Sequence, residues 1–331
     1  LTDARGLLEH AHHGVPRLGE GYTTDDNARA LLYLSLLPEG ARDEGLVRTY
    51  LAFLLHMQKE DGRFRNGLTL DGRFEDEGEA EDPTGRAVLA LAAAQRLPPP
   101  YAGPAREALL RALPALEGFT SLRGRAYALL GLLALPKEPF LEAAEALGEG
   151  LLRAFREAEP AWPYPGPLTY ANHRPVEALY AYGLAFRRQE AVALARRALA
   201  FLKEHYFTPG EEGLFFDPVG NRFMARGRDK PLFDQQPIEA KCALLAHLRF
   251  GERVLAEVAF LWCHGRNRLR APLVDAFGPM DGLTPHGPNQ NRGAEALLAY
   301  LLAWQALVQG VFPQVDEGVA LGRVFALGGR P

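Results

Sequence analysis

The sequence predicts an all-α fold, an (α/α)6 toroid in which six outer helices surround six inner ones, with one or two short β-hairpins in the loops. Helices rich in Ala and Leu recur along the chain, separated by turns rich in Gly and Pro. One plan occurs six times: a short polar tract, then Arg or Glu, then Ala, then an apolar helix. These low-charge helices alternate with more charged, amphipathic ones, which is typical of buried and surface helices respectively.

The six polar tracts mark where the inner helices are expected to begin. They contain Asp25-Asp26-Asn27 with Arg29, Glu81-Asp82 with Arg86, Ser121-Leu122-Arg123 with Arg125, Asn172-His173 with Glu177, Asp234-Gln235-Gln236 with Glu239, and Asn289-Gln290-Asn291-Arg292 with Glu295. The aligned Arg or Glu residues are 39 to 62 residues apart, which leaves room for two helices and their loops in each unit. A helical bundle or an open superhelix of similar units is the alternative, and six units with irregular loops favour the closed ring.

The more charged helices between the tracts are expected to form the outer ring. They cover roughly 43–58, 103–117, 139–158, 189–205 and 252–264, and the N-terminal stretch 2–13 is expected to supply the sixth. The Pro-rich stretch from Leu97 to Pro104 is interpreted as a tight connection between helices and not as a domain linker. We therefore expect a single toroid domain over residues 1–331.

Two loops carry the signals of β-hairpins. Asn66-Gly67 lies between Phe64 and Phe74, and a second apolar pair of segments runs from Phe215 to Phe223. Asn-Gly and similar turns between apolar residues are strong local hairpin signals. Little other strand is expected.

Composition narrows the classes of function. Hydrophobic residues make up 47% and charged residues 24% of the 331, and the net charge is −4 without a basic patch. We therefore expect no nucleic-acid and no membrane partner. No leader sequence and no apolar run approaching 18 residues occurs, which predicts a cytoplasmic protein. Few Met and Cys, 25 Pro and abundant Arg suggest a thermophile.

The sequence gives no sign of a cofactor or a metal. It contains no phosphate-binding P-loop, no dinucleotide fingerprint after a strand, no zinc-protease motif and no nucleophile elbow. His10, His12 and His13 lack the supporting ligands of a metal site. Cys242 and Cys263 are expected to be buried free thiols. The first residue is not Met, so the numbering is expected to start inside a longer chain.

The polar tracts converge on one face if the inner helices form a ring. One polar residue per tract is explained as a cap of the first helical turn, but several tracts supply three. The charged residues one turn further either pair with one another as a structural network or line a wet pocket, because unpaired burial costs several kcal/mol. We favour a mixture in which a pocket is present. The third tract is the least polar, so the mouth is expected to be lopsided.

A polar mouth with nearby aromatic residues is suited to a sugar. Asp, Glu, Asn, Gln and Arg grip pairs of hydroxyl groups, and aromatic faces cover the apolar side of the ring. The alternative is that the aromatic residues merely plug the lid of the toroid. The residues predicted to bind substrate are Tyr22, Asn27, Arg29, Arg86, Trp162, Tyr164, Tyr170, His173, Glu177, Gln235, Gln236, Glu239, Asp281, Asn289, Asn291, Arg292 and Glu295.

Cleavage of a glycosidic bond usually takes two carboxyl groups, one as proton donor and one as base or nucleophile. Asp26 and Asp82 are the preferred catalytic candidates, because each has an acidic neighbour that would push one pKa upward. Asp25 and Asp234 are the further catalytic candidates.

Several motifs resemble a bacterial family of (α/α)6 proteins described as glycosyltransferase-associated or glycosidase-like. They include the tract around Asp25-Asp26-Asn27, the run Phe53 to Gln58, the tract from Asp234 to Ala240, and Asp281-Gly282-Leu283 with the run from Asn289 to Glu295. The resemblance spans roughly 20–305 and implies a carbohydrate context such as mannoside metabolism. Pro83 and Thr84 depart from the small residue and His of that family. At fold level the chain is also similar to unsaturated glucuronyl hydrolases and sugar 2-epimerases.

Three hypotheses for the function remain after this comparison. The first is a glycoside hydrolase-like enzyme, or a partner of a glycosyltransferase or phosphorylase, that uses acid–base carboxylates on a mono- or oligosaccharide. The second is a sugar epimerase or isomerase, which needs paired histidines, and His173 and His286 are the placed candidates. The third is a non-catalytic saccharide-binding toroid.

Overall fold

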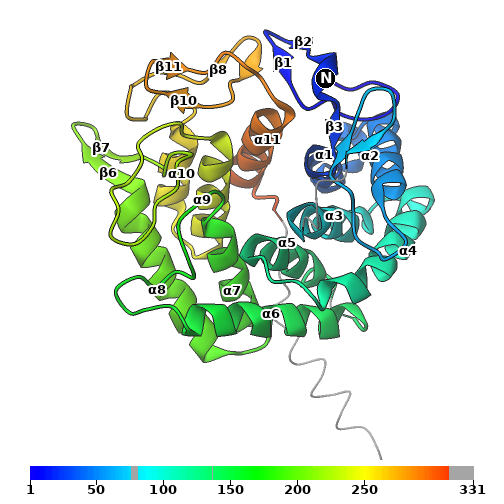
Figure 1. Ribbon diagram of the computed structural model, residues 1–331, viewed down its shortest axis with the longest axis horizontal. Coiled ribbons are helices and arrows are strands. Elements are labelled where there is room, and N and C mark those ends of the chain that lie inside the picture. Colours follow the sequence, from blue (N-terminus) through cyan, green and yellow to red (C-terminus); the bar gives the residue numbers. More distant parts are fainter. Residues whose placement is uncertain (76–80, 136, 313–331) are drawn as a thin grey trace, which may run out of the picture.

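A closed ring of six helices forms the centre of the protein (Figure 1). The computed structural model describes residues 1–75, 81–135 and 137–312. The inner helices are α1 (Thr24–Leu36), α3 (Glu81–Ala94), α5 (Leu122–Leu132), α7 (His173–Ala185), α9 (Pro237–Arg249) and α11 (Ala294–Gln309). Each packs against the next, and α11 packs against α1. This closure confirms the predicted toroid and excludes an open superhelix.

The outer helices alternate with the inner ones along the chain. They are α2 (Glu44–Met57), α4 (Pro99–Leu116), α6 (Phe140–Arg156), α8 (Gln189–Tyr206) and α10 (Arg253–Leu261), and each packs against the inner helix that precedes it. Their bounds confirm the five outer ranges predicted between the tracts. The supposed connection at 97–104 is largely helical, because α4 begins at Pro99, where a missing backbone N–H costs nothing.

The prediction that residues 2–13 supply the sixth outer helix is wrong. This stretch is extended and contains β1 (Ala11–His12), which pairs with β2 (Val15–Pro16) before the 3-10 turn η1 (Leu18–Glu20). The side chain of Asn27 holds it in place, accepting from the backbone N–H of Leu7 at 2.8 Å. The described residues therefore contain six inner and five outer helices, with a second 3-10 turn, η2 (Glu39–Ala41), between α1 and α2.

The first predicted hairpin is confirmed and the second is displaced. β4 (Gly67–Leu68) pairs with β5 (Phe74–Glu75), and β3 (Tyr22–Thr23) extends them to a three-stranded antiparallel sheet. The second hairpin is β6 (Phe207–Gly210) with β7 (Gly213–Phe216), so Phe215 and Phe216 end it instead of beginning it. The tight turn uses Gly213 at φ +92°, a conformation that favours glycine. Two further short pairs are β8 (Val274–Asp275) with β9 (Gly278–Pro279), and β10 (Leu283–Thr284) with β11 (Gly287–Pro288).

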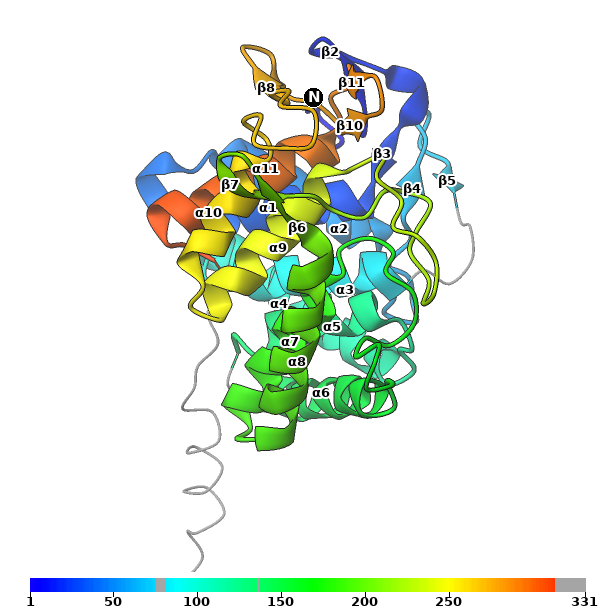
Figure 2. The same cartoon turned by 90° about the vertical axis from the view of Figure 1, so that its left-hand side faces the viewer.

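All these strands lie in the connections that lead into inner helices. These connections are long, except for 117–121 before α5, whereas those that lead from inner to outer helices are short. We call the face at the N-terminal ends of the inner helices the mouth. Figure 2 shows β3, β4, β10 and β11 beyond the helix ends. The short connection 117–121 agrees with the lopsided mouth that the weakly polar third tract predicted.

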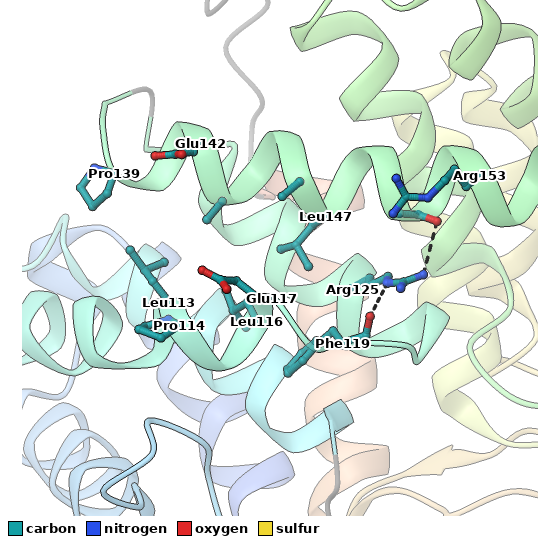
Figure 3. A pocket seen from close by; sticks show the side chains of 13 residues that line it. Leu113, Pro114, Leu116, Glu117, Phe119, Arg125, Pro139, Glu142, Leu147 and Arg153 are labelled. Carbon is teal, nitrogen blue, oxygen red and sulfur yellow. Dashed lines mark hydrogen bonds between the residues drawn. The ribbon is translucent and has the colours of Figure 1, made fainter.

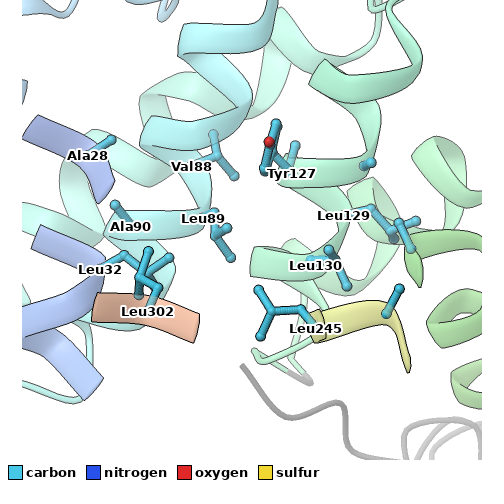
Figure 4. Close-up of a cluster of buried hydrophobic side chains, with 14 of the residues drawn as sticks. Ala28, Leu32, Val88, Leu89, Ala90, Tyr127, Leu129, Leu130, Leu245 and Leu302 are labelled. Carbon is cyan, nitrogen blue, oxygen red and sulfur yellow. The ribbon is translucent and has the colours of Figure 1, made fainter. Parts of the chain in front are cut away.

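Leucine side chains fill the centre of the ring on the side of the C-terminal halves of the inner helices. Leu32, Leu89, Leu130, Leu245 and Leu302 come from five inner helices, and each stands eight positions after the first residue of its helix. All five are at most 5% exposed, and they gather between the facing helices (Figure 4). We call them the leucine layer. It provides an apolar floor, so polar groups on the axis are confined to the mouth side.

Cys242 and Cys263 are buried free thiols, as predicted. None of the helices within the described ranges is both long and apolar enough to cross a membrane.

Helices α3 and α5 approach each other most closely at glycines. A Cβ atom on Gly85 would lie 2.5 Å from the carbonyl oxygen of Gly124, and one on Gly131 would lie 2.7 Å from the Cα of Leu89. Both contacts are with backbone, which gives way only if the helices move apart. The small residues are therefore required by the inner ring.

Gly131→Ala is expected to lower the free energy of unfolding by about 1–3 kcal/mol, because the added methyl group overpacks the α3–α5 contact. Gly103→Ala is the matched control, since Gly103 is exposed within α4 and a Cβ there meets nothing within 4 Å. The control should raise stability by about 0.5–1 kcal/mol through helix propensity. Urea unfolding curves measure both changes. Equal effects of the two substitutions would contradict the close approach.

Candidate functional site

A polar pocket of about 210 Å³ opens at the mouth between the start of α1 and the start of α11. Its walls come from the N-terminal segment, the β3–α1 junction, the loop after α2, the start of α9 and the segment before α11. The lining residues are Glu9, His10, Thr23, Asp25, Asp26, Arg29, Asn66, Gln236, Pro237, Asp281, Gly293, Glu295 and Ala296. We call it the mouth pocket.

Five carboxyl groups meet in the mouth pocket. They belong to Glu9, Asp25, Asp26, Asp281 and Glu295, and the cations in the lining are Arg29 and, when protonated, His10. Asp25, Asp26, Asp281, Glu295, Arg29 and Gln236 were predicted from the sequence as site residues, and the structure brings these six together.

Arg29 joins the carboxyl groups at the bottom of this pocket. It is 5% exposed. Its guanidinium donates to Asp26 through Nη1 and to Glu295 Oε2 through Nη2, the latter at 2.6 Å. Asp25 Oδ2 lies 4.0 Å from the same Nη2 and is also bonded by Arg86 of α3. One planar fork therefore fixes two acids on opposite sides, and the two acids come from the first and the last inner helix.

Asp26 is held at the beginning of α1 by the helix cap. Thr23 is the N-cap: its hydroxyl accepts from the Asp26 backbone N–H at 3.2 Å and donates to Asp26 Oδ2 at 2.9 Å. Burial raises the pKa of Asp26, and the charge of Arg29 only partly offsets this, because the carboxylates of Glu295 and Asp25 raise it further. Asp26 is thus a buried acid with both oxygens engaged.

Glu9 and His10 enter the pocket from the extended N-terminal segment. The Glu9 carbonyl accepts from the Ala294 N–H at 2.8 Å, which ties this segment to the start of α11. Burial raises the pKa of Glu9 to about 6, and the charge of Asp26 adds to the rise. Hydrogen bonding to Asp281 raises the pKa of His10, whereas Asp281, despite its burial, has a lowered pKa because His10 and the Gly293 N–H stabilise the anion.

Sequence reasoning missed Glu9 and His10 as site residues. It placed both in an outer helix, and a lone Glu-His pair in a polar stretch carries no motif. Their place in the pocket follows from backbone pairing with segments distant in sequence, such as Leu8 with Tyr22 and His12 with Asn291.

Asp82 lies outside the lining of the mouth pocket. It accepts hydrogen bonds from Ser121 Oγ at 2.6 Å, Arg123 Nε at 2.7 Å and Tyr170 Oη at 2.7 Å. Burial alone would raise its pKa, but the charge of Arg123 and these hydrogen bonds lower it below the usual value. The Arg123 guanidinium also lies 4.0 Å from the centroid of the Tyr170 ring. Asp82 is therefore a fixed anion that links three inner-helix starts.

The predicted sugar-stacking residues do not line the mouth pocket. Trp162 donates its indole N–H to the Gly166 carbonyl and packs edge-on against Phe201 of α8. Tyr164 is 4% exposed and packs edge-on against Phe155. Both line a separate groove of about 610 Å³ beside the end of α6. Among the described residues that line the mouth pocket there is no Phe, Tyr or Trp.

Tyr22 and Asn27 hold the N-terminal segment. The Tyr22 hydroxyl donates to Asp3 Oδ2 at 2.6 Å, and its ring is 1% exposed. Asn27, fully buried, exchanges hydrogen bonds with the backbone of Leu7 and donates to the Thr23 carbonyl at 2.8 Å. These two residues position the wall that carries Glu9 but do not face the pocket.

His173 is the first residue of α7, but its side chain is buried in the core and does not line the mouth pocket. It is fully buried, with its ring edge-on to Tyr206 and its centroid 5.7 Å from that of His247. Burial lowers its pKa well below the usual value. His286, the other histidine considered for epimerase chemistry, is exposed on the turn between β10 and β11.

The fifth tract splits between the pocket and the scaffold. Gln236 lines the mouth pocket, whereas Gln235 is buried and bonds Asp217 and Trp262. Asp234 accepts a hydrogen bond from Asn221 at 3.2 Å and is not part of the lining.

The sixth tract splits in the same way. Asn291 bonds both His10 and Asp281 and so supports the pocket wall. Asn289 is exposed and caps the Asn291 N–H, and Arg292 turns away to Asp275 at 2.7 Å.

Four of the six aligned charges lie outside the lining of the mouth pocket, and of these Arg86 is bonded to Asp25 of that lining. Arg125 donates to the carbonyls of Phe119 and Gly150 on the side of α6. Glu177 is buried between Arg174 and Arg249; their charges outweigh the effect of burial and lower its pKa. Glu239 accepts from the Ala171 N–H at 2.5 Å. The expectation that every aligned charge points into the ring therefore fails for Arg125.

A third pocket, of about 380 Å³, lies between α4 and α6 (Figure 3). Apolar side chains such as those of Leu113, Leu116, Phe119 and Leu147 make most of its wall, and Arg125 lies at one end. It is remote from the starts of the inner helices that hold the carboxyl groups. In the part of the chain that the structure describes, no group of three His, Cys, Asp or Glu residues is arranged to hold a metal ion.

Comparisons with known proteins identify the fold. No protein-family model and no curated protein matches the sequence. Among solved structures, a D-mannose isomerase is similar with a TM-score of 0.69 at 9% identity, covering 94% of this chain and 93% of its own. A cellobiose 2-epimerase from Spirochaeta thermophila has a TM-score of 0.62 at 15% identity, with 93% and 90% covered. The GH76 α-mannanase of Bacteroides thetaiotaomicron has a TM-score of 0.60 at 11% identity, with 94% and 89% covered. Such low identities establish the toroid fold alone.

Glu239→Gln is expected to remove a pH dependence of stability. Burial raises the pKa of Glu239 to about 8. A raised acid pKa means that the folded protein favours the protonated form, so stability is fully present below about pH 4.5 and is lost as pH rises to about 8. The free energy of unfolding of the variant should therefore rise relative to that of the wild type between about pH 4.5 and pH 8. Chemical unfolding at pH 4–9 measures the difference, with Glu204→Gln on the exposed face of α8 as control. A constant difference across the range would contradict the assignment.

Proposed function

We propose that this protein is a carbohydrate-active enzyme that cleaves or transfers the glycosidic bond of an oligosaccharide or of a monosaccharide glycoside bound in the mouth pocket. The observation that carries the proposal is the gathering of five carboxyl groups in the lining of this one pocket. Glycoside chemistry needs one acid that gives up a proton and one carboxylate that acts as base or nucleophile. Glu9 and Glu295 provide that combination within a single pocket.

Glu9 is the proposed proton donor. Its pKa of about 6 allows it to hold a proton near neutral pH and to release it during the reaction. Its side chain is 34% exposed, so a leaving oxygen has access to it. The charge of Asp26 helps to raise this pKa, which makes Asp26 a positioning residue for the donor.

Glu295 is the proposed base or nucleophile. Its side chain is 37% exposed, and Arg29 donates a hydrogen bond to its Oε2 at 2.6 Å, which fixes the carboxyl group at the wall of the pocket. Asp25 has one buried oxygen, Oδ1, without a hydrogen-bond partner in the described structure. A substrate hydroxyl would satisfy that oxygen, which makes Asp25 a candidate for binding. This assignment replaces the pairing of Asp26 with Asp82.

The size and polarity of the pocket favour one sugar ring over an extended chain. Sites for drug-sized ligands measure about 300–1,000 Å³, and the mouth pocket is smaller, at about 210 Å³. Asn66, Gln236 and Thr23 add amide and hydroxyl groups to its wall. The described lining contains no Phe, Tyr or Trp on which a sugar ring could stack, which leaves hydrogen bonding as the main source of specificity.

The named activities of the similar structures support a sugar substrate without choosing the reaction. An isomerase or epimerase is the second candidate, because two of these three neighbours carry such names. That chemistry was expected to use paired imidazoles. Within the described residues the mouth pocket contains one imidazole, that of His10, since His173 is in the core and His286 is on an exposed turn. The carboxyl groups therefore favour the first candidate.

A thermal-shift screen of mono- and oligosaccharides, followed by product analysis on each hit, should find a substrate of the wild type. Glu9→Gln and Glu295→Gln are expected to lower kcat by about 10²–10⁴-fold, the usual contribution of an acid or base. Glu204→Gln, the exposed control, should leave kcat unchanged. Asp26→Asn should shift the apparent pKa of the proton donor downward in the pH–rate profile, since it removes a neighbouring negative charge.

Full activity in both Glu9→Gln and Glu295→Gln would refute the proposed acid–base pair. Epimerised or isomerised products without bond cleavage would instead support the second candidate.

A further inference from the structure

Four cationic side chains lie buried on the mouth side of the leucine layer. Arg29, Arg86, Arg174 and Lys241 come from four different inner helices, α1, α3, α7 and α9, and each is at most 5% exposed. Arg29 and Arg86 were predicted from the sequence as site residues. Arg174 and Lys241 were not. We call these four residues the axial cations.

Two of the axial cations flank one phenol. Tyr127 of α5 is 2% exposed, and its ring centroid lies 4.7 Å from Arg86 Cζ and 5.5 Å from Arg174 Cζ. Burial lowers the pKa of Lys241 to about 8, and the charges of Arg174, Arg29 and Arg86 contribute to the fall. Lys241 lies four residues before Leu245 of the leucine layer, on the same side of α9. Arg29 and Arg86 each lie three residues before the leucine of their own helix, so they also face the axis.

Protein carboxylates do not fully pair these charges. Arg86 is bonded to Asp25, Arg29 to Asp26 and Glu295, and Arg174 to Glu177, whose other oxygen accepts from Arg249. Lys241 has no hydrogen-bond or ion-pair partner among the described residues. Lys241 is therefore a buried ammonium group without a direct counter-ion, and burying such a group costs several kcal/mol.

Unpaired hydrogen-bond donors accompany the unpaired charge. Arg29 Nε, Arg86 Nε and Nη2, Arg174 Nε and Tyr127 Oη are all buried without a partner in the described structure. A buried donor without a partner costs about 1–3 kcal/mol, and native proteins contain few of them. Five such atoms on these four buried side chains are too many for an ordinary core.

We propose that the axial cations and Tyr127 bind a phosphate group. A phosphate offers three or four acceptor oxygens and up to two negative charges, which suits donors that approach from five helices. A carboxylate offers only two oxygens in one plane, so it fits this arrangement less well. Asp25 Oδ1, also buried and unpartnered, would accept from a protonated phosphate oxygen.

The phosphate site adjoins the mouth pocket. Arg29 and Asp25 line that pocket, and Arg86 is bonded to Asp25. The occupant is either inorganic phosphate or the phosphate of a phosphorylated sugar whose ring lies in the mouth pocket. The second possibility rests on the proposed function, whereas binding of inorganic phosphate does not.

The test uses the full chain, dialysed into phosphate-free buffer and titrated with inorganic phosphate at constant ionic strength. Wild type should show saturable binding by calorimetry and a phosphate-dependent rise in Tm that an equal concentration of chloride does not give. Lys241→Met keeps the length of the side chain and orphans no partner. It should raise Tm in the absence of phosphate and weaken phosphate binding at least tenfold.

Two further variants keep the result interpretable. Tyr127→Phe removes a single donor and should weaken phosphate binding by a smaller factor than Lys241→Met does. It tests the site independently if Lys241→Met fails to fold. Lys203→Met removes an exposed lysine of α8 and should change neither quantity. Glucose 6-phosphate, compared with glucose plus phosphate, tells a phosphorylated sugar from the free ion.

Absence of saturable phosphate binding by the wild type would overturn the proposal. Binding that survives unchanged in both Lys241→Met and Tyr127→Phe would also overturn it, because the phosphate would then lie elsewhere. Phosphate binding in a protein without glycosidase activity would support the site while refuting the proposed function, so the two failures are distinguishable.

Discussion

The fork of Arg29 between Asp26 and Glu295 is the interaction on which the mouth depends. It ties α1, the first inner helix, to α11, the last, at the point where the ring closes. Arg29 and Asp26 are both buried, and a buried charge is costly without its partner, so removing either would strand the other. The same contact holds two acids at the edge of the pocket. The contact that closes the ring between α1 and α11 is therefore also the contact that positions the acids of the pocket.

Polarity changes in steps along the axis of the ring. Leucines from five helices fill the C-terminal half, the axial cations lie above them, and the carboxyl groups face the mouth. Each step follows from the helical repeat, because axis-facing positions recur every three to four residues. Asp26, Arg29 and Leu32 of α1 follow this spacing. One helix face thus changes from acidic to basic to apolar within three turns.

The sequence predicted the ring better than it predicted the pocket. The repeated tracts locate the start of every inner helix, because caps and apolar periodicity are local signals. Which side chain faces the axis depends on helix rotation, which alignment of tracts ignores. In α9 the alignment chose Glu239, whereas Lys241 is the axial residue. Glu9 is positioned by strand pairing with distant segments, which no local pattern reveals.

The aromatic residues show why composition near a site is weak evidence for its chemistry. Trp162 and Tyr164 were expected to stack on a sugar, yet they pack against the outer helices α8 and α6. Large rings bury much apolar area, so a nearby core outcompetes a polar cleft for them. What remains at the mouth is hydrogen-bonding and ionic. Such a pocket distinguishes ligands by where their charges and hydroxyl groups lie. Asp25 belongs to the carboxyl groups of the mouth pocket and is also bonded to the axial cation Arg86, so it connects the pocket with the axial cations.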